Sequence, residues 1–160
     1  MRQDRFLQGI LIFILILVIA ALVSYFGFQR EQNYLPESSP ENISRNYVLA
    51  LHNKDYLKAY GYLQQTEHTP SFMQFQDSLI RLQPLLSDTG VQIIALDQQE
   101  DRAALEIVLI HGGNGPFGSA WREEATGLLI REGQEWKISY FPHPYWGWDW
   151  ESPPRPLSTD

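Results

Sequence analysis

The sequence contains no cysteine among its 160 residues, and this absence removes several kinds of chemistry at once. Disulfide bridges, thiolate nucleophiles and cysteine metal ligands are excluded, as is a lipid anchor on a processed cysteine. The four histidines are scattered along the chain, and no two of them have the i, i+4 spacing of a helical metal-binding pair. We therefore expect no metal site and no cofactor.

Basic residues are also scarce. Residues 31–160 hold 9 Lys and Arg against 18 Asp and Glu, a formal charge of −9. An acidic surface repels nucleic-acid phosphates and anionic lipid headgroups, so this composition argues against nucleic-acid binding.

One segment lacks charge altogether. Residues 6–28, FLQGILIFILILVIAALVSYFGF, form a run of 23 uncharged residues. At about 1.5 Å of rise per residue, a helix of this length reaches roughly 35 Å, enough to cross a hydrocarbon core of about 30 Å with some tilt. The run is apolar on every side, so it does not read as a helix lying on a membrane surface. The alternative is a cleaved signal peptide, but that would have a shorter apolar region and small residues at its end. An uncleaved signal anchor is the better interpretation.

The charges that flank this segment predict its orientation. Arg2 and Arg5 precede it together with the terminal amine, whereas Arg30 is the only basic residue close behind it. Basic residues favour the cytoplasmic side, so we expect a single-pass cell-membrane protein with a cytoplasmic N-terminus and an extracytoplasmic domain.

Helical patterns come first in the rest of the chain. Ser39, Pro40 and Glu41 predict a helix start, and the segment Asn53–Asp55 ends that helix. A second short helix is expected from Tyr56, and Thr69 and Pro70 open a third that Pro84 should end. The predicted inward-facing residues of the three helices are Ile43, Tyr47, Ala50 and Leu51; Tyr56, Leu57, Ala59, Tyr60 and Leu63; and Phe72, Phe75, Leu79 and Leu82.

Strand patterns follow, at residues 91–96, 103–110, 119–131 and 135–141. Helices followed by consecutive hairpin-linked strands indicate an α+β domain, with about three helices packed on a curved antiparallel sheet of about four strands.

Two stretches carry a family resemblance. NYVLALHNKDYLKAYGYL (Asn46–Leu63) and LLIREGQEWKISYF (Leu128–Phe141) resemble the helical start and closing hairpin of the nuclear transport factor 2-like, or cystatin-like cone, superfamily. Within it, the chain is similar to uncharacterised bacterial domains carried behind a membrane anchor. The resemblance covers residues 40–142. It implies a cone whose sheet curls around the helices and leaves a pocket at one end.

The expected organisation has five parts. They are a cytoplasmic tip (1–5), a transmembrane helix (6–28), a stalk (29–39), the α+β domain (40–144) and an aromatic, proline-rich tail (145–160).

The most unusual feature is FPHPYWGWDW, at residues 141–150. In an extended chain Trp146, Trp148 and Trp150 would point to one side. Packing over the sheet or into the cone is one interpretation. Docking of a partner or glycan is a second, and contact with the membrane surface is a third. The candidate binding residues are Tyr47, Tyr60, Tyr145, Trp146, Trp148 and Trp150.

The leading functional hypothesis is a non-enzymatic, membrane-anchored domain that binds a protein, a wall glycan or a small molecule; its oligomeric state is open. The alternative is a pocket enzyme of the isomerase or cyclase kind, because enzymes of the superfamily hold an acid used as a base within the cone. The residues considered for that chemistry are Tyr47, Tyr60, Asp97, Glu106, His111 and Glu123. None lies in a matching motif, and strand alternation gives Glu106 a solvated face.

Overall fold

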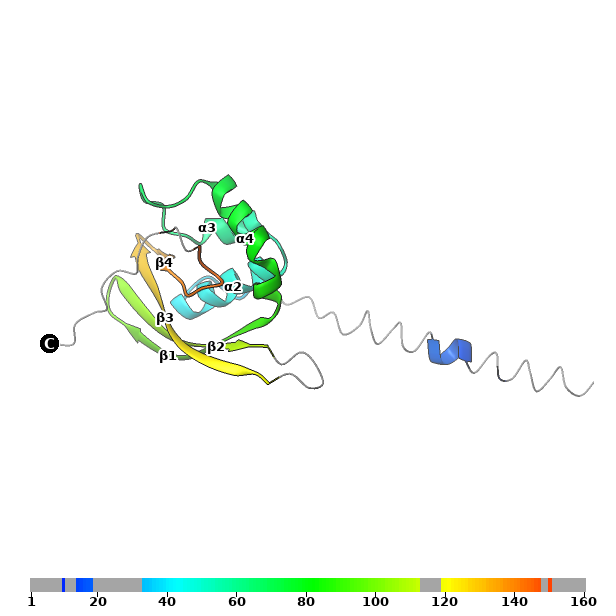
Figure 1. Ribbon diagram of the computed structural model, residues 1–160. Helices are drawn as coiled ribbons and strands as arrows, with labels where there is room; N and C mark the ends of the chain where they lie inside the picture. The colour runs from blue at the N-terminus through cyan, green and yellow to red at the C-terminus, as the bar shows by residue number, and fades with distance from the viewer. Residues whose placement is uncertain (1–9, 11–13, 19–32, 113–118, 148–149, 151–160) are drawn as a thin grey trace, which may run out of the picture. The chain divides into compact units, whose positions relative to one another are not determined.

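The computed structural model describes residues 10, 14–18, 33–112, 119–147 and 150 (Figure 1). The chain divides into two units, Met1–Asn33 and Tyr34–Asp160. Residues 10 and 14–18 are helical, and no helix in the ranges just given has the length and apolar character needed to span a membrane. The predicted cytoplasmic tip, most of the predicted span and the end of the predicted tail lie outside the described residues.

Local capping explains where the first two helices of the domain begin. Helix α2 (Pro40–His52) starts as predicted, because the Ser39 hydroxyl accepts the Asn42 N–H at 3.2 Å. Helix α3 (Tyr56–Gly61) starts in the same way, with the Asp55 carboxylate accepting the Lys58 N–H at 3.2 Å. The segment Asn53–Asp55 therefore both ends one helix and caps the next.

Helix α4 (Phe72–Ser87) differs from its predicted limits at both ends. Its cap is Ser71, which forms a capping box with Gln74. Pro84 lies inside the helix, so the prediction that it ends the helix is wrong. Proline removes one backbone hydrogen bond, but Leu86 in the following turn is buried in the core and holds that turn in place.

The predicted inward face of α3 is only partly correct. Tyr56 and Ala59 are buried, whereas Leu57 is 71% exposed. Leu63 is buried but lies beyond the helix, where it bridges in parallel to Ile138. A six-residue helix makes less than two turns, so its periodicity is too short to identify one face.

The predicted sheet is confirmed. Strands β1 (Thr89–Gln98), β2 (Arg102–His111), β3 (Trp121–Glu132) and β4 (Glu135–Tyr140) pair in sequence order, and every pair is antiparallel. The β3–β4 turn places Gly133 at a φ of 65°. A glycine with positive φ at the first central position is typical of a two-residue hairpin turn.

The three helices cover one face of this sheet, which bends around α2 (Figure 1). Alternate residues of β2 point into the layer between helices and sheet, and Leu105, Ile107 and Leu109 are buried there while Glu106 is exposed. The α+β class and the solvated position of Glu106 are thereby confirmed. The core residues are Ile43, Tyr47, Ala50, Leu51, Tyr56, Ala59, Tyr62, Leu63, Phe75, Leu79, Leu86, Ala103, Leu105, Ile107, Leu109, Leu129, Trp136, Ile138, Phe141, Tyr145 and Trp150.

The end of the predicted stalk packs on the domain instead of standing free. Asn46 is 1% exposed, and its side chain binds both backbone groups of Leu35. Its Oδ1 accepts the Leu35 N–H at 2.7 Å, and its Nδ2 donates to the Leu35 carbonyl at 2.8 Å. The packed part of the chain therefore begins near Tyr34, because a buried side-chain amide needs partners and finds them in this segment.

Candidate functional site

The described part of the aromatic C-terminal segment, residues 141–147 and Trp150, contains turns and is not one extended strand. The Tyr145 N–H donates to the Pro142 carbonyl at 3.0 Å, and the Trp150 N–H donates to the Gly147 carbonyl at 3.3 Å. These turns bring the rings of Trp146 and Trp150 edge to face at 5.1 Å, so these two indoles do not line one side of a straight strand. Trp148 lies outside the described residues.

Two of the four predicted binding residues in this segment belong to the core. Tyr145 and Trp150 are buried, and Trp146 is partly buried. The ring of Trp150 stacks on Phe75 of α4 at 5.2 Å. The rings of Tyr145 and Trp150, which follow the predicted boundary at residue 144, are therefore packed against α2 and α4.

Tyr145 connects this segment to α2 and β1. Its carbonyl accepts the Tyr47 hydroxyl at 2.6 Å, and its own hydroxyl donates to the Thr89 carbonyl. The Tyr145 hydroxyl also lies 3.0 Å from His52 Nε2. Burial raises the pKa of both tyrosine hydroxyls and lowers the pKa of His52. The two tyrosines are held as neutral hydrogen-bonding groups of the core, and His52, which is itself exposed, contacts Tyr145 from the end of α2.

Tyr60 lies apart from Tyr47 and Tyr145. Its hydroxyl donates to the Pro70 carbonyl at 2.8 Å, which joins α3 to the start of α4. Its ring contacts Phe75 edge to face at 5.3 Å. Of the predicted binding residues, the structure brings Tyr47 together with Tyr145 and Trp146 together with Trp150.

A polar cluster at the end of the β2–β3 pair includes two of the residues considered for catalysis. His111 Nδ1 lies 3.2 Å from Thr89 Oγ1, and His111 Nε2 lies 3.2 Å from Glu123 Oε2. The imidazole also stacks on Trp121 at 4.0 Å, and Trp121 is 56% exposed. Sequence reasoning did not single out Trp121.

The catalytic alternative gains no support from the described residues. Asp97 and Glu106 are exposed, and the Glu123 side chain is 51% exposed, so none of these carboxylates lies inside an apolar pocket. Aliphatic and aromatic side chains fill the space between helices and sheet. Within the same residues no group of three or more His, Asp or Glu side chains could hold a metal ion.

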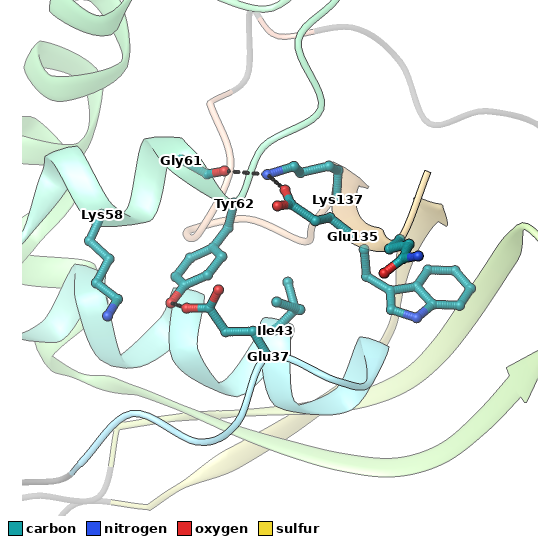
Figure 2. A pocket seen from close by; sticks show the side chains of 9 residues that line it. Glu37, Ile43, Lys58, Gly61, Tyr62, Glu135 and Lys137 are labelled. Atoms are coloured by element: carbon teal, nitrogen blue, oxygen red, sulfur yellow. Dashed lines mark hydrogen bonds and ion pairs between the residues drawn. The ribbon is translucent and has the colours of Figure 1, made fainter. Parts of the chain in front are cut away.

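A pocket of about 550 Å³ lies beside β4 (Figure 2). Its volume falls within the range of roughly 300–1,000 Å³ typical of ligand sites. The lining residues are Glu37, Ile43, Lys58, Gly61, Tyr62, Gln134, Glu135, Trp136 and Lys137. The N-terminal segment, α2, α3 and the β3–β4 hairpin all contribute to it.

The floor of the pocket is apolar and its walls are charged. Ile43, Tyr62 and Trp136 are each almost fully buried. Figure 2 shows the Tyr62 hydroxyl directed at Glu37, to which it donates a hydrogen bond of 2.7 Å. Burial and the Glu37 carboxylate both raise the pKa of Tyr62, so this hydroxyl stays a donor at neutral pH.

Lys137 forms the opposite wall. Its ammonium group donates to the Gly61 carbonyl at 3.1 Å and lies 2.9 Å from the Glu135 carboxylate (Figure 2). A cation at the C-terminal end of a helix is favourable, because the last carbonyls of the helix carry partial negative charge. On the side of Glu37, the Lys58 ammonium lies 3.5 Å from the centre of the Tyr34 ring. The polar groups of the pocket are therefore fixed by contacts within the domain.

Sequence reasoning named none of the pocket residues as a site. The pocket depends on contacts between distant parts of the chain, such as the Lys137–Gly61 bond across 76 positions. The packing of Leu35 on Asn46 brings Glu37 close to α2. This contact joins residues 11 positions apart and corresponds to no sequence motif.

Comparison with known proteins gives a distant likeness only. No protein-family model and no curated protein matches the chain. Among solved structures, a SEC-C motif containing protein from Rhodopseudomonas palustris aligns with a TM-score of 0.48 and 12% identity, over 66% of this chain and 79% of that one. A nuclear transport factor 2-like protein from Campylobacter jejuni aligns with a TM-score of 0.48 and 12% identity, over 65% of this chain and 100% of that one.

A nuclear transport factor 2-like protein of unknown function from Cytophaga hutchinsonii aligns with a TM-score of 0.40 and 12% identity, over 68% of this chain and 96% of that one. Likeness at this level assigns no family and no activity to the chain. A shared fold does not imply a shared function, so the evidence for function lies in the pocket of this chain.

Proposed function

We propose that this protein is a membrane-tethered, non-enzymatic binding domain, and that the pocket beside β4 receives its partner. The observation that carries the proposal is the pocket itself, which combines an apolar floor with charged walls in a volume of about 550 Å³. Binding sites typically combine such apolar area with a few fixed polar groups. The filled interior of the domain makes a pocket enzyme the weaker candidate.

The tether is the second part of the proposal. The apolar segment 6–28 supports a signal anchor, and the arginines at positions 2 and 5 support a cytoplasmic N-terminus. Leu35, the residue clamped by Asn46, comes seven residues after the end of this segment. Such a short connection would confine the domain to partners near the membrane, where a high effective concentration compensates for modest affinity.

The tether is tested on the full chain in its native membrane. We expect the wild-type protein to resist alkaline extraction, and a variant carrying Ile14→Arg and Leu17→Arg to be extracted. Each arginine at the centre of a span costs about 2.5–3.5 kcal/mol on insertion scales. Extraction of the wild-type protein would rule out the anchor, and protease protection of the domain in sealed cells tests its orientation.

The pocket is tested by site-specific photo-crosslinking in the same membranes. A photo-reactive residue in place of Gln134, which lines the pocket, should crosslink a partner, whereas one in place of the exposed Gln92 on β1 should not. Crosslinks from both positions, or from neither, would contradict the proposal.

Gly61 lines the pocket and offers a variant that places a side chain there without disturbing the core. A side chain at Gly61 would meet no atom within 4 Å at its Cβ, and leucine is a better helix former than glycine. Gly61→Leu should therefore abolish the crosslink from position 134. Leu57→Phe is the matched control, because Leu57 lies on the same helix, is 71% exposed and does not line the pocket.

A further inference from the structure

The outer edge of β4, the edge that faces away from β3, is covered over only part of its length. The Ile138 N–H donates to the Tyr62 carbonyl at 2.8 Å, and the Ile138 carbonyl accepts the Gln64 N–H at 2.8 Å. Leu63 thus bridges in parallel to Ile138. Upstream of Tyr62 the chain belongs to α3, which ends at Gly61, and so does not continue along the strand.

The covering therefore stops before Trp136. Backbone groups of successive residues in a strand point to opposite edges, so the N–H and carbonyl of Trp136 face the same edge as those of Ile138. The hairpin register agrees, because Glu132 and Glu135 flank the turn and Arg131 and Trp136 form the next pair. In the described part of the chain neither backbone group of Trp136 has a partner on this edge.

The pocket lies along this uncovered stretch, since Gln134, Glu135, Trp136 and Lys137 all line it. An unpaired donor and acceptor on one strand residue match the carbonyl and N–H of an extended peptide. The apolar floor formed by Ile43, Tyr62 and Trp136 suits one apolar side chain. Successive side chains of an extended peptide point to opposite faces. The residues on either side of that apolar side chain would therefore point away from the floor, and we expect them to be polar.

We propose that the occupant of the pocket is an extended segment of a partner protein, which adds a short strand to the free edge of β4 at Trp136. This inference rests on the proposed function and names the class of partner. The pairing supplies sequence-independent recognition through the backbone, and the floor selects an apolar side chain between polar neighbours.

Hydrogen exchange of single amides in the full chain, in detergent micelles, tests this proposal. The probe is a pool of short acetylated peptides that alternate apolar and polar residues, at millimolar total concentration. In the free protein we expect the Trp136 amide to exchange rapidly and the Ile138 amide slowly. Of these two amides, only that of Ile138 donates a hydrogen bond, to the Tyr62 carbonyl. The pool should slow exchange at Trp136 by about tenfold or more, as a new backbone hydrogen bond requires.

Three controls separate strand addition from other binding. A pool with the same side chains but N-methylated backbones should give no protection, and Gly61→Leu should abolish protection while Leu57→Phe retains it. Equal protection by the methylated pool, or unchanged exchange at Trp136 with the first pool, would overturn the proposal. Protection without peptide that grows with protein concentration would identify a second copy of this chain as the occupant, which also overturns it.

The outcome for the proposed function is separate. If position 134 still crosslinks a partner and Gly61→Leu abolishes that crosslink, while the Trp136 amide stays unprotected, the pocket binds its partner by side chains alone. The proposed function would then stand and strand addition would fail. If position 134 yields no crosslink, the proposed function itself fails.

Discussion

Replacing Asn46 with alanine should loosen the segment that joins the predicted anchor to the domain. Asn46 is 1% exposed, and its amide binds the N–H and the carbonyl of Leu35 at 2.7 and 2.8 Å. This paired contact is the first polar link between the incoming chain and α2, and it precedes the bond between Glu37 and Tyr62 in the pocket wall.

The magnitude follows from the two hydrogen bonds. Each contributes about 1 kcal/mol net to folding, so their loss costs about 2 kcal/mol. The larger penalty for orphaned buried groups does not apply in full, because Leu35 is 40% exposed and water can reach its backbone. For a domain of this size, a loss of about 2 kcal/mol lowers the Tm by roughly 8 °C.

Unfolding of the full chain in detergent, followed by tryptophan fluorescence, measures this change. Asn42→Ala is the matched control, because Asn42 donates to the Pro36 carbonyl at 2.9 Å in the same segment but at an exposed site. We expect the control to cost about 0.5 kcal/mol or less. If Asn46→Ala costs no more than Asn42→Ala, the buried amide does not hold the segment and the account of this clamp is wrong.

Three further predictions concern the core and its titration. Tyr145→Phe keeps the ring but removes the hydroxyl that contacts His52 and the Thr89 carbonyl. Urea unfolding should then show that the free energy of unfolding falls by about 1–3 kcal/mol. A decrease below about 0.5 kcal/mol would contradict the role of this hydroxyl. Burial lowers the pKa of His52 and of His143 in the folded state, so the unfolded chain takes up protons more readily. The Tm should therefore fall as the pH drops below about 6.5. A Tm that does not change between about pH 7.5 and 5.5 would refute this prediction. Pro84→Ala restores a backbone donor inside α4 and should raise the free energy of unfolding by about 2 kcal/mol. The gain of roughly 3 kcal/mol in the helix is reduced by the greater conformational freedom of the unfolded alanine chain. A loss of stability would mean that the proline ring makes stabilising contacts.

Local chemistry accounts for the parts of the fold that the sequence predicts well. Ser39, Pro40 and Glu41 place the start of α2 because a cap acts within its own first turn. The strand patterns at residues 91–96 and 135–141 locate β1 and β4, because alternation of apolar and polar residues is visible within a single strand.

Tertiary contacts decide what the sequence predicts poorly. Burial of Leu86 carries α4 past Pro84, and burial of Asn46 draws the expected stalk onto α2. The sequence around Tyr145 and Trp150 is equally compatible with buried and with exposed side chains. Only the folded structure shows that Tyr145 contacts His52 and that Trp150 stacks on Phe75. The pocket is hardest to predict, because Glu37, Gly61 and Lys137 meet only in the folded domain.

The central claim is that the pocket beside β4 is the binding surface of this domain. Its most direct test is the dissociation constant of the partner captured from position 134, measured for the full chain and for Gly61→Leu. A leucine at this lining position should weaken binding at least about tenfold, a change of 1.4 kcal/mol, while Leu57→Phe leaves the constant unchanged. Equal affinity of the wild-type protein and Gly61→Leu would contradict the claim.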